Sequence, residues 1–242
     1  MKNVIADVEI LESASELPAR NFANEPSFRM RVYDALKRAI IEKDIYSSKE
    51  PCWIDERQIA EKLGTSRTPI REALSALERE GFVVSVRRKG TMVVRKTKSE
   101  IVEMIEAWAA LESMAARLIT LSASDEAIAQ LRKLFIAFNE THKPSEHLSE
   151  YSQANISFHQ SVIRLSGSKT LMALTEDLLL HVRGIRQLTM NRAFRSDQTI
   201  RDHLAIIDAL ERRDTELAER LSREHTLVLA RYIAQQPDGI LF

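Results

Sequence analysis

The chain has 242 residues, in which 35 lysines and arginines balance 35 aspartates and glutamates. This length leaves room for two modest domains, each able to bury a hydrophobic core without the support of disulfide bonds or structural metal ions. The single cysteine, Cys52, excludes an internal disulfide, and the lack of any apolar run of about 18 residues excludes a membrane-spanning helix. The acidic start of the chain, with Asp7 and Glu9, is unlike a signal peptide, so we expect a cytoplasmic protein.

The balanced total conceals an uneven distribution of charge. Residues 27–98 hold 17 basic and 10 acidic residues, whereas residues 99–242 hold 16 basic and 20 acidic residues. A basic segment is the electrostatic footprint of a surface that binds the phosphates of nucleic acid. We therefore expect the nucleic-acid-binding part of the chain in its first half.

Two elements precede the most informative stretch. Residues 1–26 mix acidic, small and apolar residues, which predicts a mobile or loosely docked arm, with a short helix possible over residues 4–11. Residues 27–44 then place apolar side chains on one face at helical spacing. The apolar face of this predicted first helix consists of Phe28, Val32, Ala35, Leu36, Ala39 and Ile40.

Residues 55–94 predict a helix, a tight turn, a second helix and a hairpin. Gly64 ends the first helix, because glycine tolerates the positive φ of a sharp turn. Ser66 is a candidate N-cap of the second helix, Pro69 is tolerated in its first turn, and Gly81 ends it. The buried side of this second helix is predicted to contain Ile70, Ala73, Leu74 and Leu77.

Hydroxyl and guanidinium groups gather at the start of the second helix. These groups belong to Ser66, Arg67, Thr68 and Arg71. A helix N-terminus carries free N–H groups and partial positive charge, and arginine makes forked contacts with guanine, so this end suits a DNA groove. The hairpin that follows is predicted to be a wing with Arg87, Arg88, Lys89 and Gly90 at its tip.

The segment LGTSRTPIREALSALEREGF, with the basic tip and apolar strand after it, resembles the GntR family of transcriptional regulators. The resemblance implies a winged helix-turn-helix over residues 27–95 that binds double-stranded DNA. It implies DNA contacts from Arg57, Ser66, Arg67, Thr68, Arg71, Arg87, Arg88 and Gly90. The chain departs from the family at SSKEPCWID, where a proline-glycine turn is common, and Cys52 and Trp53 are left unexplained. A helical hairpin with merely solvated arginines is the alternative.

Everything after residue 98 is helical in pattern, and Ser99 is a candidate N-cap. Helices are predicted over residues 99–121, 124–141, 145–165, 168–191, 196–212 and 214–235. The predicted fold class is therefore mainly α: a winged helix-turn-helix followed by an antiparallel bundle of about six helices in residues 96–242. This bundle resembles the FCD-type effector domain of the FadR branch of the family, in its six-helix, VanR-like version.

Three of the six histidines have spacings that suggest a metal site. His203 and His225 lie at similar distances on either side of a turn at residues 213–214, so antiparallel helices would bring them level. Asn155 and His159 share a helix face. The family has an acidic residue where Asn155 stands. Imidazoles with one oxygen donor suit a divalent ion, with zinc expected and nickel or manganese as alternatives.

Other interpretations of these histidines remain open. A lone histidine is more often a hydrogen-bonded core residue, which is our expectation for His142, His147 and His181. Three histidines with an open position also resemble catalytic zinc, so a metal-dependent hydrolase is the alternative function. A purely structural metal is a third interpretation.

The resemblance also suggests an effector site. Arg183 and Arg186, with Arg192 and Arg201 nearby, could hold a carboxylate effector through forked contacts. Trp108 stands where many relatives carry a pocket arginine. The alternatives are that Trp108 is simply a core residue and that each of these arginines is a surface charge. The predicted function is a non-enzymatic, homodimeric transcriptional regulator, a repressor by expectation, that reads a palindromic operator and responds to a small organic acid.

Overall fold

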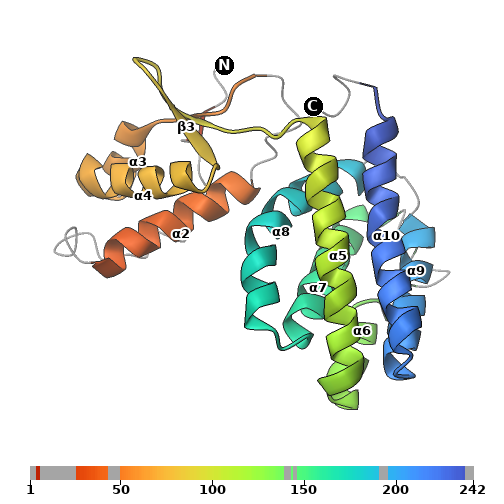
Figure 1. The fold of residues 1–242 in the computed structure, drawn as a ribbon. Helices are drawn as coiled ribbons and strands as arrows, with labels where there is room; N and C mark the ends of the chain where they lie inside the picture. The colour runs from red at the N-terminus through yellow and green to blue at the C-terminus, as the bar shows by residue number, and fades with distance from the viewer. Residues whose placement is uncertain are drawn as a thin grey trace. The chain divides into compact units, whose positions relative to one another are not determined.

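The computed structural model of the chain describes residues 4–5, 26–42, 50–138, 143, 146–190 and 196–237. The chain divides into two compact units, Met1–Arg95 and Lys96–Phe242 (Figure 1). The predicted fold class is confirmed, because a winged helix-turn-helix precedes an all-helical unit. Among the described helices, none combines the length and the apolar character that a membrane crossing requires.

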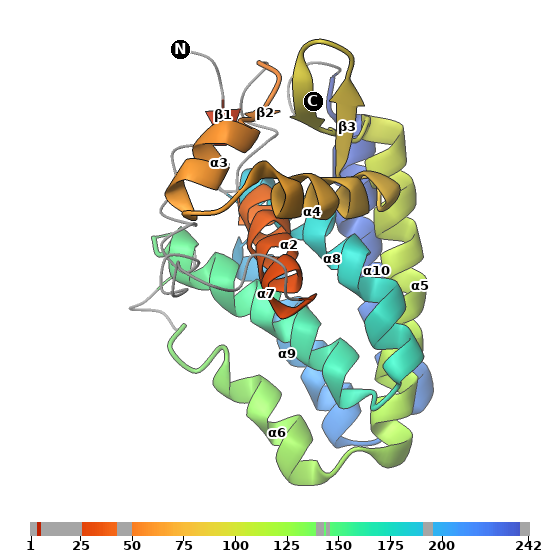
Figure 2. The ribbon, with the colours of Figure 1, turned by 90° about the vertical axis from the view of Figure 1, so that its left-hand side faces the viewer.

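The first unit contains helices α2 (Pro26–Glu42), α3 (Glu56–Lys62) and α4 (Arg67–Arg79). Figure 2 shows α4 lying across α2, and the predicted apolar faces of both helices are buried against the core. Asp55 caps α3, since its carboxylate accepts hydrogen bonds from two backbone N–H groups. Ser66 is the N-cap residue of α4, as predicted, although its side chain makes no capping hydrogen bond.

A small sheet completes the first unit, in the order β1-β2-β4-β3. The hairpin of β3 (Val83–Val86) and β4 (Gly90–Val93) is the predicted wing. Strand β2 (Trp53–Ile54) pairs antiparallel with β4, and β1 (Val4–Ile5) pairs parallel with β2. Sequence analysis missed both strands and considered a helix over residues 4–11; the rest of the predicted arm lies outside the described residues.

Strand β2 explains the segment that departed from the family pattern. Cys52 is buried, and its carbonyl oxygen accepts a hydrogen bond of 2.8 Å from the Val93 backbone. Trp53 pairs with Met92 across the sheet. The unusual segment therefore ties the chain before α3 to the wing.

The second unit is the predicted bundle of six helices in its described part. Their bounds are α5 (Lys98–Ser122), α6 (Asp125–Lys133), α7 (Leu148–Leu165), α8 (Lys169–Met190), α9 (Ser196–Glu211) and α10 (Thr215–Gln235). The long helices α5 and α10 run side by side (Figure 1), α7 and α8 contact α5, and α9 contacts both long helices. The core between these helices includes Trp108, Tyr151 and Phe158.

Two details of the second unit correct the predictions. The N-cap of α5 is Thr97 rather than Ser99, because Thr97 and Glu100 form a reciprocal capping box. Helix α6 ends at Lys133 rather than near residue 141. After it, backbone bonds to the third residue back tighten the chain, and Phe135 turns into the core, 3% exposed.

Candidate functional site

The first candidate site is the solvent-facing start of α4. One face of this helix is buried through Ile70, Ala73, Leu74 and Leu77. Burial of these residues leaves the side chains of Ser66, Arg67, Thr68 and Arg71 exposed at the N-terminal end. Cations therefore surround a helix terminus that already has free N–H groups, which favours contact with anionic phosphates and base edges.

The wing presents a second group of cations. Arg87, Arg88 and Lys89 are exposed at the tip between β3 and β4. Gly90 closes the turn with φ +111°, a conformation that side chains rarely adopt even though open space surrounds the position. Arg88 also has a positive φ, 64°. The tight turn holds three consecutive cations together outside the sheet.

One groove joins these two groups. It has a volume of about 920 Å³, and its charged lining consists of three acidic residues, Glu50, Asp55 and Glu56, and five cations, Arg57, Arg67, Arg71, Arg88 and Lys89. The structure thus brings together cations from α3, the start of α4 and the wing tip. Arg71 is also ion-paired, because its Nε donates to Glu56 Oε2 at 2.8 Å. Ser66, Thr68 and Arg87 are exposed nearby in sequence but do not line this groove.

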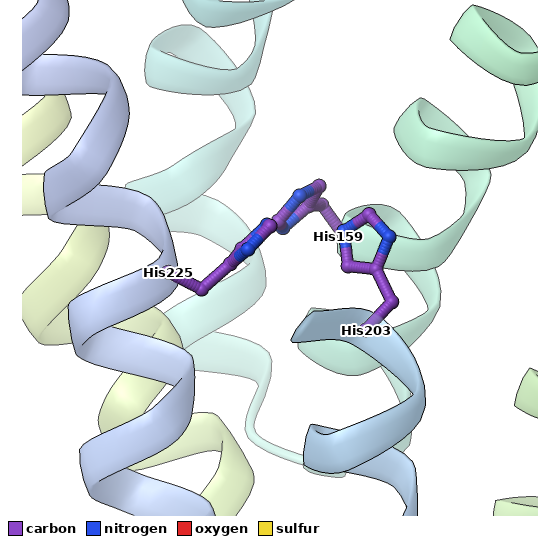
Figure 3. A group of neighbouring side chains, drawn as sticks. All are labelled: His159, His203 and His225. Atoms are coloured by element: carbon purple, nitrogen blue, oxygen red, sulfur yellow. The ribbon is translucent and has the colours of Figure 1, made fainter. Parts of the chain in front are cut away.

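The second candidate site is a cluster of three imidazoles in the second unit. Figure 3 shows His159, His203 and His225 reaching toward one another from α7, α9 and α10. One nitrogen from each ring lies within 4.8 Å of the other two. His159 and His203 are buried, whereas His225 is partly buried. Three helices that are distant in sequence therefore converge on one point.

Carboxylates lie beside two of these three rings, and neither carboxylate was predicted from the sequence to be a site residue. Glu112 on α5 is 1% exposed, its Oε1 lies 2.5 Å from His159 Nδ1, and its Oε2 accepts a hydrogen bond from the Thr226 hydroxyl. Asp202 Oδ2 lies 3.6 Å from His225 Nδ1. Each contact uses Nδ1, so Nε2 is left as the nitrogen through which these two histidines would bind an ion.

Aromatic rings hold the third histidine. The ring of His203 stacks on Phe135 at a centroid distance of 4.9 Å and lies 4.4 Å from the Phe158 ring. Asn155 is buried on α7 one turn before His159, as the spacing predicted. Its oxygen as a fourth ligand remains a prediction.

The donor set fits a borderline divalent ion. Neutral imidazoles bind zinc at about 2.0–2.1 Å in a tetrahedral shell, so two ligating nitrogens on one ion are about 3.4 Å apart. The three ring nitrogens here lie within 4.8 Å of one another, so rotation of the side chains that brings them closer by up to about 1.4 Å would complete this geometry. Carboxylates behind two of the rings match the outer-shell partners that metal-binding histidines usually have.

The predicted effector residues are only partly described. Trp108 is 1% exposed in the core cluster, and its Nε1 has no hydrogen-bond partner among the described residues. The side chains of Arg183 and Arg186, and the whole of Arg192 and His142, lie outside the described residues. Arg201 is exposed and donates to Gln198 on its own helix. His181 is buried on α8, and His147 stands at the N-cap position of α7.

Comparison with known families agrees with this two-part structure. Residues 28–93 match the bacterial regulatory proteins of the gntR family, and residues 103–227 match the FCD domain. The three-histidine cluster lies within the second match, and FCD domains are known to bind metal.

Individual relatives are regulators. The "Probable D-xylose utilization operon transcriptional repressor" of Paenarthrobacter nicotinovorans is 31% identical over 191 residues, which cover 77% of this chain and 81% of that protein. The transcriptional repressor GlaR of Escherichia coli is 28% identical over 178 residues, 71% of this chain and 81% of that one. These relatives and both domains are those of transcriptional regulators and not of enzymes, which removes the hydrolase alternative.

A solved structure shares the fold. Escherichia coli McbR/YncC superposes with a TM-score of 0.68 at 21% identity, covering 86% of this chain and 97% of that chain. At this identity the match supports a common fold, and it carries no statement about ligands.

Proposed function

Because the chain belongs to the GntR family of bacterial transcriptional regulators and carries an FCD domain, we propose that it represses transcription by binding a palindromic operator as a homodimer. A small organic acid bound in the helical domain would alter that binding, since a ligand shifts an equilibrium through different affinities for two states. The observation that carries the proposal is the groove that collects cations from α3, α4 and the wing. Such a protein would act in the cytoplasm, where the operator is.

DNA reading is assigned to the exposed start of α4. This end would enter the major groove, where Arg67 and Arg71 can make forked contacts with guanine. The remaining predicted contacts would position the protein on the sugar-phosphate backbone. They are Arg57, Ser66, Thr68, Arg87, Arg88 and Gly90.

The dimer would supply the second reading head. A palindromic site requires two heads related by a two-fold axis, and half-sites one helical turn apart. Support for self-association comes from the second unit, where the contacting helices α5 and α8 expose Met114 (46%) and Leu174 (56%) to solvent. Large apolar side chains on adjoining elements are typical of protein interfaces.

The metal is assigned to His159, His203 and His225, with Asn155 as the oxygen donor. Zinc is the expected ion, and nickel or manganese are alternatives: imidazole suits zinc and nickel, whereas manganese would depend on the oxygen donors. An ion with an open coordination position would supply Lewis-acid attraction for a carboxylate. Within the chain itself, Glu112 and Asp202 would hold two of the rings in the orientation that the ion needs.

The effector is assigned to the neighbourhood of Trp108, Arg183 and Arg186. A buried N–H donor without a partner is costly, so the indole of Trp108 favours a ligand oxygen in this region. Trp108 also lies one helical turn before Glu112 on α5, which places both residues on the same face.

The experiment that tests the proposal measures three properties of the purified protein in sequence. Metal analysis should find about one ion per chain, and a thermal-shift panel of carboxylic acids should then identify the effector. A mobility-shift assay at fixed salt should show that this acid changes DNA affinity. Trp108→Phe should lose the thermal shift while it keeps the metal. An effector response unaltered in this variant would contradict the assignment of Trp108.

A further inference from the structure

Arg67 and Arg71 lie on the same exposed end of α4, yet their surroundings differ. Arg71 donates from Nε to Glu56 Oε2 at 2.8 Å, and the two side chains are 62% and 25% exposed. Arg67 is exposed and makes no ion pair among the described residues. Both arginines line the groove between α3, α4 and the wing, together with Glu56. Glu50 and Asp55 line the same groove, but Glu56 is the acidic residue that pairs with Arg71 in the surface assigned to DNA.

A carboxylate at this position is unfavourable for binding phosphate. It repels the DNA backbone and lowers the local positive potential. The negative charge of Glu56 is nevertheless stabilised within the protein, because Glu56 lies in the first turn of α3 and a helix N-terminus favours negative charge. A contribution from Glu56 to DNA binding must therefore come from its effect on a neighbouring side chain rather than from attraction.

The Glu56 contact leaves the useful edge of the guanidinium available. Nε is bound by the carboxylate, whereas a forked contact with guanine O6 and N7 can be made by the two terminal nitrogens. A long side chain that is already held loses less conformational freedom on binding than a mobile one. It also samples fewer orientations that fit other bases.

Resting on the proposed function, we propose that Glu56 is a positioning residue for DNA reading. It holds the guanidinium of Arg71 at one angle, so that Arg71 discriminates guanine from other bases in each half-site. Glu56 thus increases sequence selectivity and decreases general affinity for DNA.

The test uses the full-length protein and a library of duplexes with random sequence, from which bound DNA is selected and sequenced. Arg71→Ala should erase the preference at one position of each half-site. Glu56→Gln should weaken the preference at that same position by about tenfold, while binding to unselected DNA stays equal or becomes tighter. In the Arg71→Ala background, Glu56→Gln should leave the base preferences unchanged.

Glu72→Gln is the matched control. It removes the same charge from the residue that follows Arg71 on α4, but Glu72 pairs with Arg29 at 3.5 Å rather than with Arg71. This variant should keep the parental base preferences.

Two results with Glu56→Gln would overturn the inference. One is an unchanged preference at the Arg71 position, and the other is an equal loss of affinity for all sequences, which indicates a merely structural role. If Arg71→Ala instead lowers binding uniformly, Arg71 contacts phosphate, and the inference fails while DNA binding stands. If the parent selects no sequence at all, the proposed function fails.

Discussion

The two candidate sites are built in opposite ways. The DNA-binding groove takes its cations from a 33-residue span, Arg57 to Lys89, and these side chains are exposed and individually replaceable. The histidine cluster takes its ligands from three helices, and two of its rings are held in the core by Glu112, which is itself bound by Thr226, and by two phenylalanines. A surface site can therefore change specificity without changing the fold. The buried site couples any change of ligand to the packing of the whole bundle.

The largest expected effect is a loss of operator binding that leaves the histidine cluster unaffected. Arg67→Ala combined with Arg71→Ala should weaken operator binding on the order of 100-fold or more, because each forked contact contributes about 1–3 kcal/mol. Both side chains are exposed, so the melting temperature and the metal content should stay at parental values. A mobility-shift assay at fixed salt measures the first quantity. Arg79→Ala, at the far end of α4, is the control and should bind normally.

Loss of a predicted metal ligand should affect only the second unit and should leave DNA binding unchanged. His203→Ala should abolish metal binding, measured by metal analysis after dialysis, and should lower the melting temperature, since bound ligand stabilises the folded state. Because His203 also packs on two phenylalanines, His225→Ala serves as a second variant in a less buried place. Either protein should still bind DNA. Full metal content in both variants would remove the cluster from consideration as a metal site.

A smaller effect is expected from Glu112, which contacts a predicted metal ligand and is not itself a ligand. Glu112→Gln should reduce metal affinity by about 10- to 100-fold, because outer-shell partners of histidine ligands typically contribute that much. Competition with a chromogenic chelator measures the change. Glu103→Gln, on the exposed first turns of the same helix, is the control and should match the parent. Equal affinities for the two variants would mean that Glu112 is structural only.

The smallest expected effect concerns the start of α5. Thr97→Ala should destabilise the second unit by about 1 kcal/mol, the usual contribution of an N-cap hydroxyl, measured by urea denaturation. The backbone N–H and then the hydroxyl of Thr97 lower the pKa of Glu100 below its ordinary 4.5. A lowered folded-state pKa gives stability above pH 4.5 that is lost as the pH falls through the folded-state pKa. The difference between variant and parent should therefore shrink in acid.

Local structure was predicted correctly from the sequence. The turn at Gly64, the cap position of Ser66 and the wing tip follow from neighbouring residues, and so the winged helix was predicted nearly in full. Strand β2 was missed because two residues carry no periodicity, and only pairing with β4 makes them a strand. Thr97 and Ser99 are both suitable caps, and the choice depends on which of them Glu100 reaches.

The buried site was predicted only as far as its histidines. Their spacing along α9 and α10 indicated that they could meet, but nothing near Glu112 in the sequence points to His159, which lies 47 positions later. Glu112 stands in a largely apolar stretch of α5, and a buried acid of this kind is itself a signal that a partner exists. The identity of that partner required the packing of α5 against α7.

The packing of Phe135 and Phe158 against His203 affects how a metal ion would enter and leave the site. Phe135 and Phe158 leave that imidazole little freedom to swing, and Glu112 restrains His159 in the same way. His225 faces Asp202, whose side chain is 32% exposed, so this is the side open to water. Exchange of a metal ion would therefore begin with release of the His225 side chain. His159 and His203 would stay in their ligating orientations and would bind the next ion.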